Sequence, residues 1–360
     1  MNGFTSPEEV GLTESNRAGF QFDSVDKLLQ TPAPIDWVLK GQLPKGSLVV
    51  AYGDPESAKS LIFVNLAIHV ALGDPFCGLR VPQGAAFYLN GEGAHGLGRR
   101  LKAYSEHHRK DLVGCPLFFS QTAASLSDPE SAEDVSLAIQ EIAHKHNVEP
   151  RVIIIDTLAR NSGPIDENSN SDVGRFITNI EEFLISRTGA TVILVHHTGH
   201  KDKLRARGAS ALLAAVRLEF RITKDGSIVR MEATKSNDFE RPAPLSFEIK
   251  GVQLPWVDAD DEQVTGPIVL PITYIPKKKS LSLGKNQRIA LNKLILLHED
   301  HQFKLRSENQ NPDDAMILLD EWRSACREGG INGKRFPEVL DALKAKGVLQ
   351  TTGNLVKPRK

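Results

Sequence analysis

The sequence is poor in cysteine, in aromatic residues and in long apolar runs. Its 360 residues include 3 cysteines, and aromatic side chains make up 6%. Because Cys77, Cys115 and Cys326 are scattered, we expect neither a disulfide framework nor a structural zinc site, and a reducing compartment is favoured. No apolar run approaches a membrane-spanning length, and the opening "MNGFTSPEEVGL" does not resemble a signal peptide. We therefore expect a cytoplasmic protein without a membrane partner.

The remaining composition is that of an ordinary globular chain with an uneven charge. Hydrophobic residues make up 40% and charged residues 25%, and the length suffices for two or three domains. Residues 276–360 carry 17 Lys and Arg against 10 Asp and Glu, a net charge of +7, which leaves −8 for the rest. A basic terminal module on an acidic body suggests a polyanion partner at that end, although a merely solvated basic surface gives the same pattern.

The segment "YGDPESAKSLIF", residues 52–63, matches the phosphate-binding pattern GxxxxGK(S/T) with one substitution. Ala58 stands where the pattern has its second glycine. "GSLVVAY" before the loop predicts a buried strand, and "KSLIFVNLAIHVALG" after it predicts a buried helix. This context predicts a loop that binds ATP, with Lys59 on the terminal phosphates and the Ser60 hydroxyl on Mg²⁺. The predicted loop consists of Gly53, Asp54, Pro55, Glu56, Ser57, Ala58, Lys59 and Ser60.

The effect of Ala58 depends on its backbone angle. If the position requires a positive φ, alanine strains the loop. If it requires a helical φ, the methyl group is harmless or stiffens the loop. The sequence leaves both possibilities open.

Three further strands end in polar residues that suit an ATP site. Asp156 closes "RVIIID" and predicts a carboxylate that holds Mg²⁺ through water. Glu92 follows "AAFYLN" and is the candidate base or water-orienting group, with a turn or helix cap as the alternative. "ATVILVHH" ends in His196 and His197, of which at most one faces the nucleotide because neighbours in a strand point to opposite faces. Such a pair is often structural, and no HExxH spacing indicates zinc.

Strands and helices alternate from about residue 46 to residue 275. This order predicts an α/β fold in which a parallel sheet has helices on both faces. The late strands are close in sequence and predict antiparallel additions at one edge. The expected strands are 47–52, 85–90, 116–120, 152–156, 190–196, 217–223, 228–234 and 245–250, and the expected helices are 59–72, 97–109, 131–145 and 171–187.

The flanking segments differ from this core, which we place at 32–275. Residues 1–31 are expected to be flexible, with one or two helical turns, and 276–284 to be a linker. Residues 285–360 predict three helices and a short hairpin, a winged-helix-like module that binds duplex DNA. Its candidate recognition helix is 333–346. A plain helical oligomerisation cap is the alternative.

Five motifs occur in the order found in RecA-like ATPases of the RepA type, which are hexameric replicative helicases of plasmids and related mobile elements. They are "PAPIDWVLKGQLPKGSLVVAYGDPESAKS", "FYLNGEG", "VIIIDTLAR", "VILVHHTGHK" and "RGASALLAAVR". The resemblance covers roughly residues 32–250. It implies a RecA-like fold, ATP and Mg²⁺ as cofactors, and assembly into a ring that we expect to be a hexamer.

The resemblance also implies roles for individual residues. It makes Glu92 the catalytic glutamate, Asp156 the aspartate on the Mg²⁺ side, and His197 the sensor histidine. Arg217 matches the arginine that the family offers to the ATP of the neighbouring subunit, and Lys235 in "TKSN" resembles a basic residue of the same interface. Read without the resemblance, Arg217 is equally an exposed edge residue.

The basic segment "GHKDKLRAR", residues 199–207, sits where RecA-like proteins carry a central-channel loop for single-stranded DNA. The resemblance thus implies an ATP-driven ring motor, a replicative DNA helicase, whose C-terminal module recruits it to an origin or duplex junction. The alternative is a DNA-binding regulatory ATPase that uses ATP as an assembly switch, which Ala58 and the added module favour. A metabolic kinase would need a substrate lid, and no segment suggests one.

Overall fold

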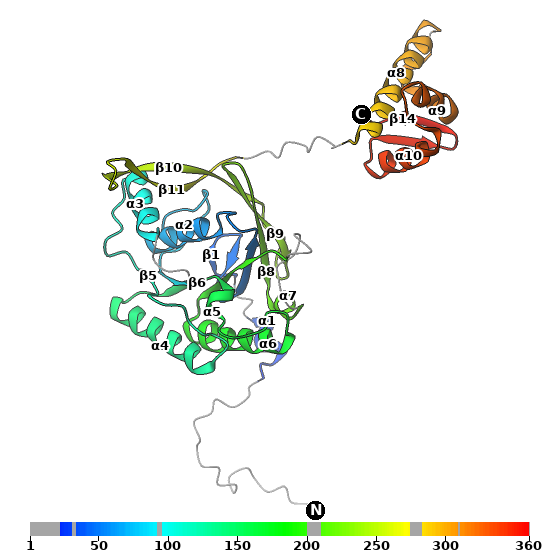
Figure 1. Cartoon of the computed structure of the whole chain (residues 1–360). Coiled ribbons are helices and arrows are strands. Elements are labelled where there is room, and N and C mark those ends of the chain that lie inside the picture. Colours follow the sequence, from blue (N-terminus) through cyan, green and yellow to red (C-terminus); the bar gives the residue numbers. More distant parts are fainter. Residues whose placement is uncertain are drawn as a thin grey trace, which may run out of the picture. The chain divides into compact units, whose positions relative to one another are not determined.

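The structure is a computed structural model that describes residues 22–30, 34–91, 96–199, 210–273, 283–308 and 310–359. The chain divides into two compact units, residues 1–273 and residues 274–360. The first is an α/β unit built on one large sheet, and the second combines helices with a three-stranded sheet (Figure 1).

A nine-stranded sheet forms the centre of the first unit, in the order β11-β10-β9-β8-β3-β7-β6-β4-β5. The strands from β8 to β5 are parallel, and β9, β10 and β11 continue the sheet in antiparallel pairing. The central strands are apolar and β-branched because both of their faces are covered. The strands are β3 (Leu48–Gly53), β4 (Ala85–Asn90), β5 (Leu117–Phe119), β6 (Pro150–Asp156), β7 (Thr191–His197), β8 (Leu218–Asp225), β9 (Ile228–Ser236), β10 (Leu245–Val257) and β11 (Gln263–Pro271).

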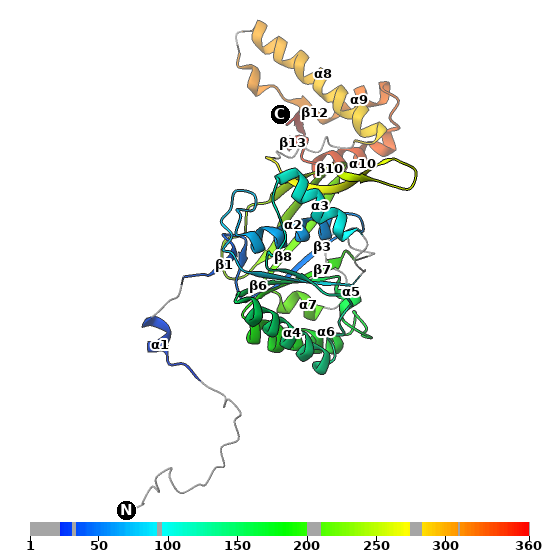
Figure 2. The same ribbon diagram turned by 90° about the vertical axis from the view of Figure 1, so that its left-hand side faces the viewer.

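Helices cover both faces of this sheet (Figures 1 and 2). Helices α2 and α3 lie on one face, and α4, α6 and α7 lie on the other, each over its own apolar core. The helices are α2 (Lys59–Leu72), α3 (Leu97–His108), α4 (Pro129–His146), α5 (Leu158–Asn161), α6 (Asn170–Asn179), which continues as the π-helical segment η2 (Ile180–Ser186), and α7 (Ser210–Ala215). Helix α1 (Val25–Gln30) and the two-stranded ribbon of β1 (Trp37–Leu39) and β2 (Leu43–Pro44) precede them.

The expected α/β fold is confirmed, with differences in the late strands. The strand expected over 217–223 pairs in parallel with β3, so the antiparallel additions begin with β9. The strand expected over 245–250 continues well beyond that range and pairs with β11, which the sequence pattern did not indicate. Gly266 and Pro267 interrupt the pattern of β11, but an edge strand tolerates proline. At Gly266 a Cβ would lie 2.5 Å from the carbonyl oxygen of Arg99, so helix α3 can approach the strand closely.

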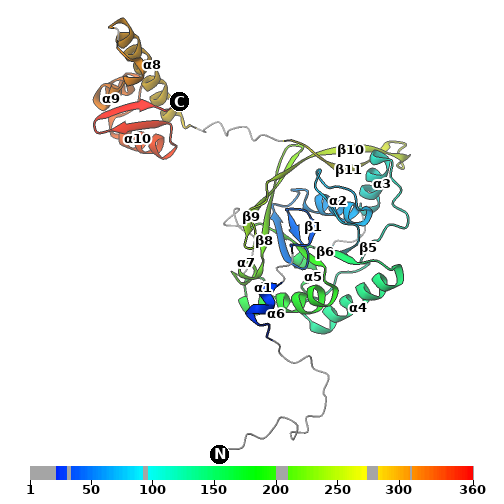
Figure 3. The same ribbon diagram turned by 180° about the vertical axis from the view of Figure 1, so that it is seen from behind.

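Strands β10 and β11 form a long hairpin that reaches over α2 and α3 (Figure 3). Ala103 of α3 packs with Leu254 and Ile268 of the hairpin in a small buried cluster. Since apolar burial of this kind holds two elements together, the hairpin and α3 form one layer above the start of α2.

The second unit has its own core around Trp322. This side chain is fully buried, its indole N–H donates to the carbonyl oxygen of Ala290 at 2.8 Å, and its ring meets the Phe336 ring edge-on at 5.0 Å. The sheet order is β12-β14-β13. The elements are α8 (Lys285–Ser307), η3 (Pro312–Asp314), β12 (Ile317–Leu318), α9 (Leu319–Glu328), η4 (Gly333–Arg335), α10 (Phe336–Ala345), β13 (Leu349–Thr352) and β14 (Leu355–Pro358).

The linker expected over 276–284 lies outside the described residues as far as residue 282. In the described part of the chain, no helix combines the length and the hydrophobicity needed to cross a membrane.

Candidate functional site

The chain between β3 and α2 folds into a compact loop around the ammonium group of Lys59. This side chain is buried, and its Nζ donates to the carbonyl oxygens of Gly53 at 2.9 Å and Asp54 at 2.8 Å. A buried charge is costly unless such partners surround it. The loop therefore holds a positive charge at the N-terminus of α2, where the helix end itself favours an anion.

Two backbone positions fix the shape of this loop. At Gly53 a Cβ would lie 2.4 Å from the carbonyl oxygen of Ile222, so the close approach of β8 requires glycine. Ala58 has φ 66° and ψ 24°, the left-handed conformation. The question that the sequence left open is thereby answered, because alanine occupies a position where a glycine is unstrained. The cost of such a conformation is about 1–2 kcal/mol.

A cavity of about 490 Å³ opens beside the loop. Its polar lining includes Lys59, Ser60, Asp156 and His197. These side chains come from α2 and from the ends of β6 and β7, because the carboxyl ends of parallel strands meet at one edge of a sheet. The cavity is of a size that holds a small-molecule ligand.

The β10–β11 hairpin and α3 complete this cavity. Ile249 and Pro267 of the hairpin form an apolar wall, and Arg100 of α3 adds a cation to the lining in addition to Lys59 and Lys224. An apolar wall next to convergent charged groups suits a ligand with a flat base and phosphates. Sequence reasoning missed Ile249, Pro267 and Arg100 because tertiary packing brings them to the loop. The available signal for Arg100 was the basic pair in "GLGRR", which closely follows Glu92.

The oxygen donors for a divalent cation lie together on one side of the cavity. Asp156 is buried, and the phenol O–H of Tyr88 donates to its Oδ2. The Ser60 hydroxyl interacts with the same phenol. Hydroxyl and carboxylate oxygens are the donors that Mg²⁺ prefers, so the residues present fit that ion. Neither here nor elsewhere among the described residues is a group of three or more His, Cys, Asp or Glu arranged to hold a metal ion.

The two strand-end histidines have different surroundings. His196 is 1% exposed and belongs to the core, whereas His197 is half-buried and lines the cavity. In the sheet, His197 is the partner of Gly53, so it stands directly beside the start of the loop.

Arg217 lies at the opposite end of the sheet from the loop. Strand β8 runs parallel to β3 with Ile222 beside Gly53, and Arg217 immediately precedes the first residue of β8. Five residues of strand separate the two ends by about 16 Å at roughly 3.3 Å per residue. The side chain of Arg217 is 64% exposed and forms an ion pair with Asp238 at 3.2 Å.

Lys235 lies near Arg217, on the neighbouring strand. Its register partner across the β8–β9 pair is Glu219. Its Nζ donates to the carbonyl oxygen of Leu213 in α7 at 2.6 Å. Arg217 and Lys235 thus lie at the end of the sheet opposite the loop, and neither of them lines the cavity of its own chain.

Two predicted elements cannot be placed in this way. Glu92 lies outside the described residues, and so does the loop 199–207 apart from its first residue.

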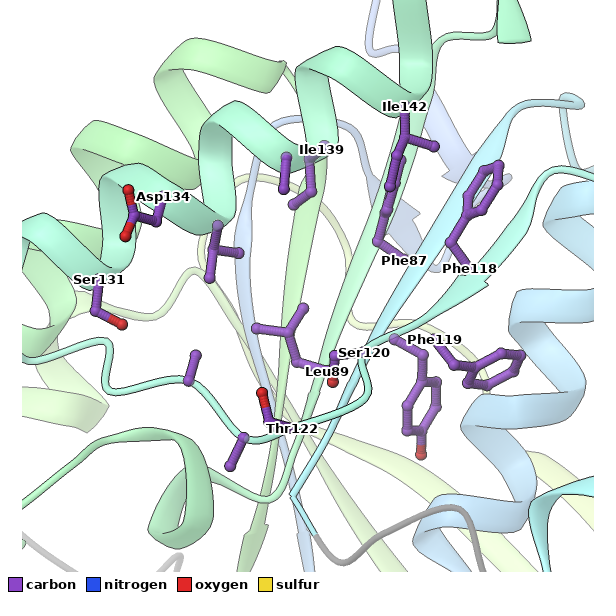
Figure 4. A pocket seen from close by; sticks show the side chains of 15 residues that line it. Phe87, Leu89, Phe118, Phe119, Ser120, Thr122, Ser131, Asp134, Ile139 and Ile142 are labelled. Carbon is purple, nitrogen blue, oxygen red and sulfur yellow. The ribbon is translucent and has the colours of Figure 1, made fainter. Parts of the chain in front are cut away.

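Another cavity, of about 310 Å³, lies on the other face of the sheet, between α4 and the strands β4 and β5 (Figure 4). Its lining includes Phe87, Phe118, Ile139 and Ile142, with Asp134 toward one end. Its lining includes no residue of the loop, so it is separate from the cavity around Lys59.

A strand, a loop around a buried lysine and a following helix, together with a strand-end aspartate at the edge of a parallel sheet, define a P-loop nucleotide-binding domain. A family model described as an AAA domain matches residues 14–203, more than half of the chain, and the chain belongs to this family. No curated protein matches the chain. The first unit is therefore a P-loop ATPase domain.

Proposed function

We propose that the protein is an ATP-hydrolysing, ring-forming motor that acts on DNA, in the manner of a replicative helicase of a mobile element. The observation that carries this proposal is the separation of Arg217 from the loop of its own chain, at opposite ends of β8. A guanidinium that reaches the γ-phosphate from such a position must belong to a neighbouring copy. A closed ring of identical subunits supplies one at every interface.

Within one subunit the cavity residues have distinct tasks. Lys59 binds the terminal phosphates, and these contacts replace its present hydrogen bonds to the loop carbonyl oxygens. Ser60 and Asp156 would hold Mg²⁺, which when bound neutralises charge on the phosphates. Glu92 orients the attacking water, and His197 beside the loop responds to the presence of the γ-phosphate.

A mechanical connection to DNA is available through α7. Lys235 joins β9 to the carbonyl oxygen of Leu213 in α7, and α7 directly follows the basic segment 199–207 in the chain. A movement of Arg217 and Lys235 when the subunit interface closes is thus transmitted to the segment that we propose binds single-stranded DNA. Basic loops of this kind hold phosphates without sequence preference.

The second unit is proposed to bind duplex DNA as a winged helix. Its order of helix, strand, helix, helix, strand and strand, with the first strand beside the last, supports this reading. The exposed face of α10 carries Glu338, whereas Lys334 and Arg335 precede the helix and Arg359 follows the hairpin. We therefore expect the phosphates to contact the start of α10 and the hairpin rather than the middle of the helix.

A strand-displacement assay tests the motor. The wild-type protein is expected to separate the strands of a forked duplex when ATP and Mg²⁺ are present. It is also expected to form a ring, which a mass measurement in the presence of an ATP analogue detects. The Lys59→Ala variant should neither unwind the duplex nor hydrolyse ATP. Hydrolysis and DNA binding without displacement would instead support the second candidate, an ATP-dependent assembly switch, which the strained Ala58 favours.

Salt dependence tests the duplex-binding role of residues 283–360, which contain a complete apolar core. Three or four phosphate contacts predict an affinity that falls about 40- to 150-fold between 50 and 200 mM salt. Fluorescence anisotropy with a labelled duplex measures this fall. Lys334→Ala should weaken binding, and Lys304→Ala on the ion-paired part of α8 should not. Binding that ignores salt would point to a protein partner.

A further inference from the structure

Tyr88 occupies an unusual place for a core aromatic residue. It lies in the middle of β4, is 3% exposed, and its ring packs against Phe119 with the centroids 5.5 Å apart. A phenylalanine would fill almost the same space in this core. The hydroxyl group is therefore the feature that packing does not explain, because a buried O–H requires a partner.

The partners of this hydroxyl are the two residues that fit Mg²⁺. The phenol donates to Oδ2 of Asp156, and the Ser60 hydroxyl interacts with it from α2. Burial, followed by the nearby carboxylate of Asp156, raises the pKa of Tyr88 well above its usual value, while Arg100 and Ser60 oppose this shift. The phenol is the donor in this pair, because a carboxylate oxygen accepts.

We propose that Tyr88 is a positioning residue, whose hydroxyl orients the Asp156 carboxylate and spaces it from Ser60 so that both can serve one Mg²⁺ ion. A carboxylate that is held through one oxygen presents the other in a fixed direction. Outer groups that hold a metal ligand in this way typically contribute 10–100-fold to metal affinity or activity. This inference rests on the proposed ATPase site and adds a residue to it.

The test is the Mg²⁺ dependence of nucleotide binding, measured with a fluorescent ATP analogue rather than by turnover. Tyr88→Phe should raise the Mg²⁺ concentration at half-saturation by about tenfold, with binding in EDTA unchanged. Tyr104→Phe is the matched control, because Tyr104 is also buried and its hydroxyl contacts His69 at 3.3 Å, away from the loop. It should leave the Mg²⁺ dependence unchanged.

A double-mutant comparison separates positioning from general loosening. In the background of Asp156→Asn, Tyr88→Phe should produce no further change in the Mg²⁺ dependence, because Tyr88 acts through that carboxylate. A wild-type Mg²⁺ half-saturation in Tyr88→Phe, or full additivity of the two changes, would overturn the inference. Absence of any Mg²⁺-dependent nucleotide binding in the wild type would instead overturn the proposed function.

If the Tyr88→Phe variant does not fold, a measurement on the protein that retains Tyr88 still tests the proposal. The chain has 4 tyrosines, so labelling with 3-fluorotyrosine gives few ¹⁹F resonances. Substituting each of the three tyrosines other than Tyr88 in turn assigns these resonances. Addition of Mg²⁺ to the protein saturated with nucleotide should shift the Tyr88 resonance and leave that of Tyr104 in place. An unmoved Tyr88 resonance would contradict the proposal.

Discussion

The two ends of strand β8 differ in almost every respect. At one end Ile222 adjoins the loop, where a buried lysine, a buried aspartate and a left-handed alanine are held tightly. At the other end Arg217 is 64% exposed and its ion-pair partner Asp238 is 43% exposed. A rigid, desolvated end suits chemistry, whereas an exposed cation suits a surface that another molecule covers. The difference is the basis of the proposed split site, in which the loop of one copy meets Arg217 of the next.

The largest expected effect comes from testing whether these two ends meet between copies. Arg217→Ala and Lys59→Ala should each lower ATP turnover by three orders of magnitude or more, because an arginine delivered in trans contributes that much. Mixed in one assembly, they should regain part of the activity, since some interfaces then pair an intact loop with an intact arginine. Turnover of the mixture against each variant alone measures this.

Two controls sharpen the mixing experiment. Asp238→Ala removes the ion-pair partner of Arg217 and should leave turnover intact, because the arginine is needed elsewhere. Arg175→Ala removes another exposed, ion-paired arginine and should also be neutral. If mixed assemblies form and stay inactive, the two ends of β8 do not cooperate across an interface.

A smaller effect is expected at the loop end from Arg100→Ala. Arg100 lines the cavity, and loss of one positioned donor to developing charge costs about a hundredfold in turnover. The neighbouring Arg99→Ala is the matched control, because Arg99 is exposed on the same helix and is not part of the lining. Equal effects of the two variants would mean that Arg100 contributes only general charge. Steady-state kinetics with ATP distinguishes the outcomes.

The smallest effect concerns the strain at Ala58. Ala58→Gly should relieve about 1–2 kcal/mol of left-handed strain, partly offset by the greater freedom of glycine in the unfolded chain, for a net gain of about 1 kcal/mol. Ala67→Gly within α2 should have the opposite sign, since glycine in a helix interior costs about 1 kcal/mol. Urea unfolding of the first unit measures both. A loss of stability in Ala58→Gly would show that the methyl group has a packing role.

The sequence predicted most of the sheet because its central strands are continuous apolar runs that end in recognisable polar residues. It also placed Lys59, Ser60 and Asp156 in one site, since the loop motif and a strand end share an edge of the sheet. It could not give the angle at Ala58, because a single letter does not determine φ. Strand β11 was missed because Gly266 and Pro267 break the alternation. Arg100, Ile249 and Tyr88 acquire their significance from tertiary contacts alone.

The apolar wall of the nucleotide cavity belongs to the last strands before the second unit. Pro267 lies in β11, which ends at Pro271, and the second unit begins at residue 274. Because the chain is continuous, a pull on the second unit would act first on the end of β11. A force that displaced Pro267 would change the apolar wall of the cavity.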